Sequence, residues 1–341
     1  MPNIPADKLE ALATRIFAGM GTPEADARLV ATLLVRANLR GHDSHGAIRI
    51  PQYAGSIRTG HVNPKSPITV LADTPVIARL DGGRGFGQVV ARRGMEMAIA
   101  KAKANGLSAV TLANTTHVGR LADYAEMAAA QGLVGMLWAN CVHGLNVAPW
   151  GGAARRLGTN PHAVAVPGVD GPAMVLDFAT SVVAEGKLRV KRNRKQPAPP
   201  GWFVDAKGRP ETDPEIFYGD PPGALLTAGE HKGYGLSLAV EILGGILSGT
   251  GPAGPPPGVF ANGTLMICLD VERFLPLRDF HRQVGALFGW VKKTPLAQNA
   301  TEILIPGEPE ARLEAERRAQ GIPIEEQTWS QIETTAAELG V

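Results

Sequence analysis

Between residues 68 and 140 the chain alternates short β-branched runs with longer segments of helical periodicity, and this alternation restricts the fold more than any other feature. A strand–helix–strand order of this kind predicts an α/β sheet. The expected strands are residues 68–71, 76–80, 107–113 and 133–140, and the expected helices are residues 88–105 and 121–131.

The first 60 residues follow a different pattern, because their apolar residues recur at helical spacing. Leu9, Ile16 and Phe17 mark one helix, and a second begins after Thr22, which is followed by proline at the first helical position. The tail of the chain is charged and helical. We therefore expect a helical unit of residues 1–67 with residues 309–341 packing back on it, and an α/β unit of residues 68–308.

The remaining segments are less regular. Residues 189–200 are basic and rich in proline, so we expect them to form an exposed, extended loop. The other expected elements are strands at 162–166, 173–178, 263–270 and 302–306, and helices at 232–247 and 278–290.

Charge and cysteine content narrow the class of protein. The 341 residues carry a formal net charge of +2, which gives no reason to expect a nucleic acid or an anionic membrane as a partner. Two cysteines, Cys141 and Cys268, form no disulfide framework and favour a reducing compartment. Because there is neither a signal-peptide pattern nor an apolar stretch of about 18 residues, we expect a soluble cytoplasmic protein.

Three glycine clusters compete as a phosphate-binding site. Residues 249–254 (GTGPAG) match the dinucleotide fingerprint letter by letter, but they follow a helix and lead into Pro255–Pro257, whereas the fingerprint needs a strand before it. Residues 83–87 (GRGFG) follow a strand, but their spacing is one residue short and favours a tight turn. Residues 229–235 (GEHKGYG) place a lysine at a helix start, where free N–H groups attract phosphate.

Candidate catalytic groups lie in a polar break between two helices and at two strand ends. The break, residues 41–46 (GHDSHG), contains His45, which could donate a proton. Arg49 follows four residues later, so it could share a helical face with His45 and hold a carboxylate. The alternative is a polar capping turn with a solvated arginine. His117 follows a strand, where α/β sheets place ligand groups, or is a loop residue. Asp177 ends a strand and either orients a histidine or caps the helix after it.

Seven ordered segments spanning nearly the whole chain resemble the malate/L-lactate dehydrogenase family, which includes ureidoglycolate and sulfolactate dehydrogenases, diketogulonate reductase and the piperideine/pyrroline-2-carboxylate reductases. These segments are RANLRGHDSHGAIRIPQY, NTTHVGRLADYAEMAA, APWGGAARRLGTNPHAVAVPG, VLDFATSVVAEGKL, GEHKGYGLSLAVEIL, NGTLMICLD and IPGEPEARLEAERRAQGIPI.

The resemblance implies a non-Rossmann NAD(P)-binding sheet domain, a helical N-terminal unit completed by the C-terminal helix, and a homodimer that uses NAD or NADP and no metal. It implies interconversion of a small 2-oxo acid and its 2-hydroxy acid. His45 would donate the proton with Ser44 beside it, Arg49 would hold the carboxylate, His117 would lie near the reacting centre and Asp177 would relay with the histidine. The implied cofactor contacts are His117, Val118, Gly119, Arg120, Leu121, Thr159, Asn160, Pro161, His231, Lys232, Gly233, Pro306, Gly307 and Glu308.

One departure from the family concerns Arg120, because many members continue the histidine as an HFG-type segment where this chain has His117-Val118-Gly119-Arg120. The arginine adds a cation beside the expected cofactor or substrate, as in the branch acting on aromatic or dicarboxylic 2-hydroxy acids. Reduction of a cyclic imino acid is the alternative within the family.

Three readings from other classes compete. A Ser-His-Asp hydrolase lacks the G-x-S-x-G elbow. A metal-dependent lyase would use His42, Asp43, His45 and His117, but the sequence fixes no further ligand. A nucleotide-binding protein without catalysis is the third.

Overall fold

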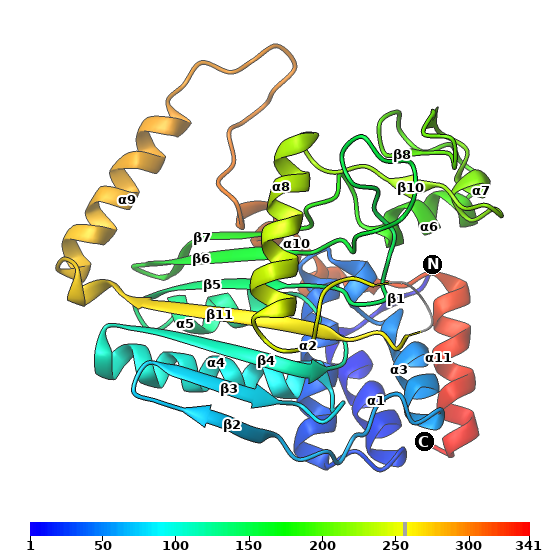
Figure 1. Cartoon of the computed structure of the whole chain (residues 1–341), viewed down its shortest axis with the longest axis horizontal. Helices are drawn as coiled ribbons and strands as arrows, with labels where there is room; N and C mark the ends of the chain where they lie inside the picture. Colours follow the sequence, from blue (N-terminus) through cyan, green and yellow to red (C-terminus); the bar gives the residue numbers. More distant parts are fainter. Residues whose placement is uncertain (255–257) are drawn as a thin grey trace.

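A seven-stranded mixed sheet forms the centre of the computed structural model, which describes residues 1–254 and 258–341 and so leaves the run Pro255–Pro257 outside the described residues. The strand order is β2-β3-β4-β11-β5-β6-β7 (Figure 1). The pair β3–β4 is parallel and the other neighbours are antiparallel. The bounds are β2 (Thr69–Asp73), β3 (Ile77–Asp81), β4 (Leu107–Thr115), β11 (Asn262–Asp270), β5 (Leu133–Ala139), β6 (His162–Gly168) and β7 (Gly171–Phe178).

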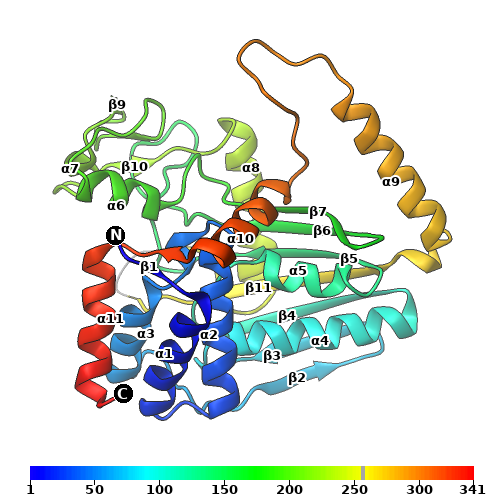
Figure 2. The ribbon, with the colours of Figure 1, turned by 180° about the vertical axis from the view of Figure 1, so that it is seen from behind.

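Helices cover both faces of this sheet, which confirms the α/β prediction. Helices α4 (Gly87–Asn105) and α5 (Ala122–Ala129) lie on one face, and α8 (His231–Val240) with the π-helix η2 (Glu241–Ile246) lies on the other (Figures 1 and 2). Helix α4 packs closely on the sheet at Gly94, where an added Cβ would lie 2.6 Å from a Leu112 methyl group. Leu80, Met95, Leu112 and Tyr124 are fully buried there, each aliphatic side chain contributing about 1.5–3 kcal/mol.

A second core joins the two ends of the chain. Helices α1 (Ala6–Gly19), α2 (Glu24–Leu39) and α3 (Arg49–Arg58) pack with α10 (Glu308–Gln320) and α11 (Glu326–Leu339), and both termini lie on this side of the molecule (Figure 2). Strands β1 (Asn3–Ile4) and β12 (Ile322–Pro323) pair antiparallel. Phe17 and Ile332 share the core, so the tail does pack back on the first residues; the division into units at residues 67 and 308 stays a prediction.

The expectation of an extended loop at residues 189–200 is wrong for its first part. Residues 185–193 form α6 (Glu185–Asn193) where an extended loop was expected from residue 189 onward. The basic sequence does not show helical periodicity, because Leu188 is the residue of this helix that is buried in a third core, with Phe203 and Phe217. Arg189 also pairs with Glu185 one turn earlier. Around this core lie α7 (Pro214–Phe217) and a small sheet of β8 (Phe203–Val204), β9 (Pro210–Glu211) and β10 (Ala224–Leu225).

A second expectation, the strand at residues 302–306, is also wrong. The segment meets β7 at one bond, from Val175 N to the Pro306 carbonyl (2.9 Å), and Pro306 has no N–H with which to continue a ladder. Before it, the 3₁₀ turn η3 (Val271–Arg273) leads into α9 (Leu277–Lys292), which reaches away from the sheet (Figure 1). No helix within the described ranges is long and apolar enough to cross a membrane.

Candidate active site

The polar break between α2 and α3 is a rigid turn. Residues 43–45 form the 3₁₀ helix η1 (Asp43–His45), and Asn38 in α2 holds the turn by accepting a bond from Ala47 N (2.7 Å). A side chain at residue 46 would overlap the Asn38 amide, so this close approach of the turn to α2 favours glycine at that position. Within the turn, Ser44 Oγ lies 3.0 Å from Nδ1 of His45. The serine therefore fixes the orientation of the imidazole that the sequence singled out.

His45 stacks on His117. The ring centroids are 5.3 Å apart and the rings are inclined by 26°, although one histidine lies in the helical unit and the other follows β4. Nδ1 of His117 lies 2.6 Å from the Tyr53 hydroxyl of α3. The structure thus brings together two imidazoles that lie far apart in the sequence.

Burial favours the neutral form of both histidines. Burial lowers the pKa of His45 to about 3, and the nearby charge of Arg49 adds to this shift. Burial and Arg49 also lower the pKa of His117 well below its ordinary value. Removing the uncompensated positive charge of Arg49 would therefore favour protonation of the pair.

Arg49 begins α3 and has no acidic partner. Its Nε donates to the Ser44 carbonyl (2.7 Å) and its Nη1 donates to Gln52 Oε1 (2.6 Å), so the guanidinium is held by neutral groups. Across residues 1–254 and 258–341 no carboxylate forms an ion pair with it. A fixed, half-buried guanidinium without a counter-ion suits an incoming carboxylate.

A cavity of about 820 Å³ opens over these groups, and both the helical unit and the sheet contribute to its walls. The expected site residues that line it are Ser44, His45, Arg49, Gly119, Arg120, Leu121, Thr159, Pro161 and Asp177. His117 does not line the cavity but stacks on His45, which does. A volume of this size is typical of small-molecule sites.

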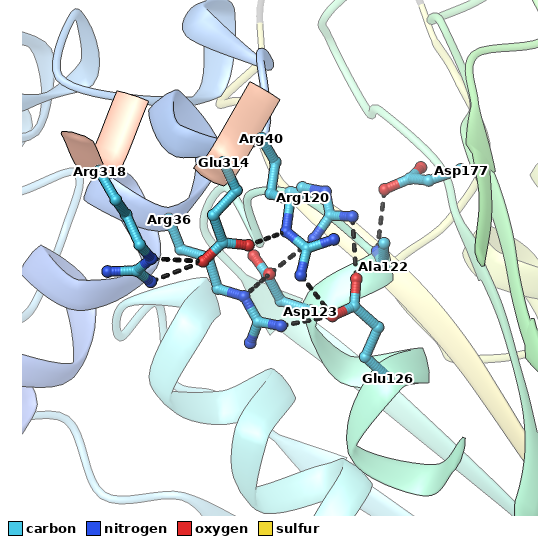
Figure 3. A network of polar contacts seen from close by, with 9 residues as sticks. All are labelled: Arg36, Arg40, Arg120, Ala122, Asp123, Glu126, Asp177, Glu314 and Arg318. Atoms are coloured by element: carbon cyan, nitrogen blue, oxygen red, sulfur yellow. Dashed lines mark hydrogen bonds and ion pairs between the residues drawn. The ribbon is translucent and has the colours of Figure 1, made fainter. Parts of the chain in front are cut away.

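Asp177 ends β7 and contacts the start of α5 rather than a histidine. Its Oδ2 accepts a bond from Ala122 N (2.8 Å), which caps α5, a helix that precedes the aspartate in the sequence (Figure 3). Burial raises the pKa of Asp177 to about 6, and Arg120 opposes the shift. Nδ1 of His45 faces Ser44 and not Asp177. A proton relay between Asp177 and His45 therefore stays a prediction.

Arg120 does not offer the free cation that its position suggested. Its side chain is 1% exposed, and it donates to Asp123 Oδ1 (2.8 Å) and Glu126 Oε1 (2.9 Å), so two carboxylates compensate its charge. Figure 3 shows the rest of the network, in which Arg36 of α2 and Arg40, directly after α2, bind the same acidic side chains or Glu314 of α10. The network connects the helical unit to the sheet.

Two of the expected cofactor segments are joined by a continuous chain of backbone contacts. Thr180 N donates to the Thr159 carbonyl (2.9 Å), and Ala228 N donates to the Thr180 carbonyl (2.9 Å). Gly233, at the start of α8, packs so closely on Ala228 that a side chain there would overlap its carbonyl. Residues 159–161 and 229–235 therefore form one surface beside the cavity.

The buried carboxylate of Glu241 contacts the segment of residues 159–161 from the protein interior. Asn160 Nδ2 donates to Glu241 Oε1 (2.8 Å) in the π-helix, a local irregularity that is frequent at functional sites. The third expected segment lies near β7: Gly307 caps α10 with a φ of 99°, and Pro309 after it lines the cavity. His231 and Lys232 are exposed at the start of α8.

The other two glycine clusters have structural explanations. Residues 83–87 make a tight turn between β3 and α4, where Gly83 N donates to Asp81 Oδ1 (2.7 Å) and a side chain on Gly87 would overlap the His117 carbonyl. Residues 249–254 follow η2 and have no strand before them. Asn140 Nδ2 donates to the Gly251 carbonyl (2.9 Å), so this backbone is bound within the protein.

Sequence reasoning missed three residues that contact the site. Tyr53 lies one helical turn after Arg49, a spacing that could have indicated it. Gly186 packs against Ser44, and Lys187 lines the cavity, but both lie next to the segment that was taken for a loop. Among the described residues, no group of three or more histidine, cysteine or acidic side chains could hold a metal ion.

Comparison with known proteins identifies the family. The model of the malate/L-lactate dehydrogenase family matches residues 4–333. The chain belongs to the malate/L-lactate dehydrogenase family. Hydroxycarboxylate dehydrogenase B of Escherichia coli (strain K12) is 39% identical, with 98% of this chain and 94% of the relative covered.

Solved structures of relatives have the same fold as this chain. Sulfolactate dehydrogenase from Methanocaldococcus jannaschii has 36% identity and a TM-score of 0.90, covering 100% of this chain and 98% of the other. Δ1-piperideine-2-carboxylate reductase from Pseudomonas syringae has 28% identity and a TM-score of 0.83, covering 98% and 100%. The prediction of a dehydrogenase of this family is confirmed, and the lyase alternative finds no support among these relatives.

Proposed function

We propose that the chain is an NAD- or NADP-dependent oxidoreductase that interconverts a 2-oxo acid and its 2-hydroxy acid. The observation that supports this most directly is the stack of His45 on His117 beside the unpaired Arg49 in one cavity. Carboxylate binding and proton donation are the two requirements that a 2-oxo acid places on the protein.

The donor groups beside the cavity fit a dinucleotide. The start of α8 exposes Lys232 where the positive end of the helix dipole favours a phosphate, and Thr159, Gly119 and Leu121 lie in the cavity wall. When bound, the nicotinamide would supply or accept the hydride. Residues 159–161, 231–233 and 306–308 would hold the nucleotide.

The chain's own residues would then bind the acid and move one proton. Arg49 would hold the 2-carboxylate through its planar guanidinium, which Gln52 and the Ser44 carbonyl keep in place. That carboxylate would offset the charge of Arg49, which depresses the pKa of His45. His45 would thereby become able to carry a proton to the carbonyl oxygen when the substrate is present, with Ser44 holding its ring.

Helix α9 supports a homodimer. None of its residues is buried, and Phe280, Val284, Leu287 and Val291 recur at helical spacing on it. An apolar helix face of this length without a partner marks an interface, and a second copy of the chain is the simplest occupant. Leu287→Glu should give a monomer in analytical ultracentrifugation, whereas Arg282→Glu on the polar face should not; a monomeric parent protein would refute the dimer.

A spectrophotometric screen at 340 nm tests the proposed activity. It would pair NADH or NADPH with 2-oxo acids and with cyclic imino acids; turnover of an imino acid alone would favour the reductase alternative represented by the Pseudomonas structure. Cys141 and Cys268 are free thiols, which is in keeping with the reducing cytoplasm that we infer as the location.

Arg49→Lys tests the carboxylate site within the same assay. The lysine keeps the charge but loses the fork, so kcat/KM should fall by about tenfold or more. Unchanged kinetics would remove Arg49 from the site.

A further inference from the structure

Glu241 is a buried acidic residue to which the proposed reaction gives no direct part. It is 4% exposed at the start of the π-helix, and none of the ion pairs within residues 1–254 and 258–341 includes it. Three N–H groups bind it instead. Asn160 Nδ2 donates to Oε1 (2.8 Å), whereas Asn140 Nδ2 (3.0 Å) and Ala253 N (2.8 Å) donate to Oε2. Because all three partners are donors, the site fits an ionised carboxylate, which only accepts hydrogen bonds.

Asn160 points its side chain at Glu241 while its neighbours in the chain face the cavity. It is fully buried and has a φ of 40°, in the left-handed region that asparagine adopts more readily than most residues. Thr159 and Pro161, on either side, line the cavity. Asn160 Oδ1 accepts a bond from Cys141 N (3.2 Å), so the amide cannot turn over without losing that bond. The backbone that places residues 159 and 161 in the cavity wall is therefore held by an acceptor at residue 241.

Asn140, directly after β5, is fixed on the same carboxylate. Its Nδ2 donates to Glu241 Oε2, and its Oδ1 accepts a bond from Gly263 N (2.9 Å). If this amide turned by 180°, it would set donor against donor at Gly263 and acceptor against acceptor at Glu241. Asn140 therefore has one orientation, which the carboxylate determines.

A second buried amide continues the chain of contacts from Asn140 to the reacting histidines. Asn262, the first residue of β11, donates from Nδ2 to the Asn140 carbonyl (2.6 Å) and accepts at Oδ1 from Val118 N (3.0 Å). Val118 directly follows His117, and both amide side chains are buried. A continuous chain of buried hydrogen bonds thus joins Glu241 to the segment that carries His117.

We propose that Glu241 is a positioning residue, which holds the segment of residues 159–161 and the segment after His117 in one fixed geometry. The inference rests on the proposed function, because it assigns Glu241 to the alignment of the nucleotide with the reacting histidines. Glu241 acts through the two asparagines, since the described wall of the cavity includes Thr159 and Pro161 but not Glu241. A misplacement of about 1 Å in such an alignment can cost about 10²-fold in rate.

Glu241→Gln tests this role because it keeps the shape of the side chain but sets an NH2 group against one of the three donors. We expect kcat to fall by about 10- to 100-fold with the 2-oxo acid that the wild type reduces fastest. NADH or NADPH should bind about tenfold more weakly in a fluorescence titration. A residue that only stabilised the fold would lower the melting temperature and leave both quantities unchanged in the folded protein.

The double variant Glu241→Gln, Asn160→Asp is the matched rescue, because it exchanges amide and carboxylate across the 2.8 Å bond. The new amide can donate to the new carboxylate, and its oxygen can still accept from Asn140 and Ala253. Ser237 Oγ, a further partner of Asn160 Nδ2 (2.9 Å), can donate to the carboxylate as well. The kcat value and the nucleotide affinity should return to within about threefold of the wild type. Asn160→Asp alone sets two carboxylates against each other and should lose both.

Asp270→Asn is the control, since Asp270 is a buried carboxylate at the opposite end of β11 and accepts a bond from Glu272 N (3.3 Å). It should change kcat and nucleotide affinity by less than about twofold. If Glu241→Gln does not fold, Glu241→Asp replaces it. This variant keeps the charge but is one methylene too short to reach both amides, so the same losses are expected.

Two results would overturn the role of Glu241 and leave the proposed function intact. One is wild-type kcat and nucleotide affinity in Glu241→Gln, or in Glu241→Asp where that variant replaces it. The other is a loss that persists in the double variant although its melting temperature equals that of the wild type. No turnover by the wild type with any 2-oxo acid would instead refute the proposed function, and the role of Glu241 with it.

Discussion

The Tyr53 hydroxyl lies 2.6 Å from Nδ1 of His117 and accepts a hydrogen bond from Gln88 Nε2 (2.8 Å). Because Gln88 donates to the tyrosine oxygen, the tyrosine can direct its own proton toward the histidine. Burial raises the pKa of Tyr53 to about 12, so the phenol stays protonated. His117 should therefore accept at Nδ1 and carry its proton on Nε2.

Tyr53→Phe tests this tautomer. The variant loses the donor, so ¹⁵N NMR of the ring nitrogens of His117 should change from the Nε2–H form to a mixture of tautomers. We expect kcat to fall by about tenfold, the effect of one lost hydrogen bond, with little change in nucleotide affinity. A spectrum that already shows the Nδ1–H form in the wild type would contradict the assignment.

The low pKa of His45 predicts different pH profiles for the two reaction directions. Reduction needs the protonated ring, and the free-enzyme pKa is about 3. At neutral pH kcat/KM for reduction should therefore fall about tenfold for each unit of rising pH. Oxidation needs the neutral ring, which already predominates, so its kcat/KM should not depend on His45 above about pH 5.

His45→Ala provides the control for this pH dependence. It should lower kcat by about 10²- to 10⁴-fold and abolish the slope, while leaving nucleotide binding nearly normal. If the variant keeps the slope and more than about a third of the wild-type kcat, another group carries the proton, and His117 becomes the candidate.

The location of the nucleotide is tested by a matched pair of variants. Lys232→Ala removes a charge at the start of α8 and should weaken NADH or NADPH binding by about tenfold in a fluorescence titration. Gly251 has no atom within 4 Å of an added Cβ but has a φ of 97°, so Gly251→Ala should reduce stability slightly without changing affinity. Abolished binding in Gly251→Ala alone would restore residues 249–254 as the phosphate loop.

The buried ion network predicts a large effect on stability. Arg120→Met leaves the buried carboxylates of Asp123 and Glu126 without their fully buried arginine partner, and the free energy of unfolding should drop by about 3–5 kcal/mol. Arg312→Met breaks the exposed pair with Glu302 and should leave the denaturant midpoint unchanged. Equal midpoints for the two variants would show that the network does not support the fold.

The sequence predicted local structure well where apolar periodicity was strong. The helices around Leu9, Val30 and Met95 and the strands of the central sheet follow directly from spacing, since burial of one face decides them. It could not predict α6, because that helix is held by a single buried leucine and by the ion pairs of Arg189 with Glu185 and of Arg192 with Glu215. Nor could it predict the absence of a strand at residues 302–306, where a proline ends the possible ladder.

The sequence indicated which residue types lie at the site more reliably than it indicated which other residues they contact. Arg49 and His45 lie where the polar break suggested. Arg49 bonds to Ser44 and Gln52, which are near it in the sequence, whereas the ring that stacks on His45 is that of His117, far away in the sequence. Arg120 illustrates the limit: its charge was evident, whereas the two acids that compensate it become visible only once α5 is folded. The contact of Gly186 with Ser44 likewise became visible only once α6 was folded.

The shared core of the two chain ends has a consequence for synthesis. On the ribosome, α1 and α2 emerge first, yet they pack against Ile322 and Ile332, which are made last. The central sheet also requires β11 between β4 and β5, so its middle strand arrives long after its neighbours. Nascent chains must therefore carry exposed apolar surface through most of elongation, and this enzyme should depend on holdase chaperones during translation more than a protein whose first helices close on each other.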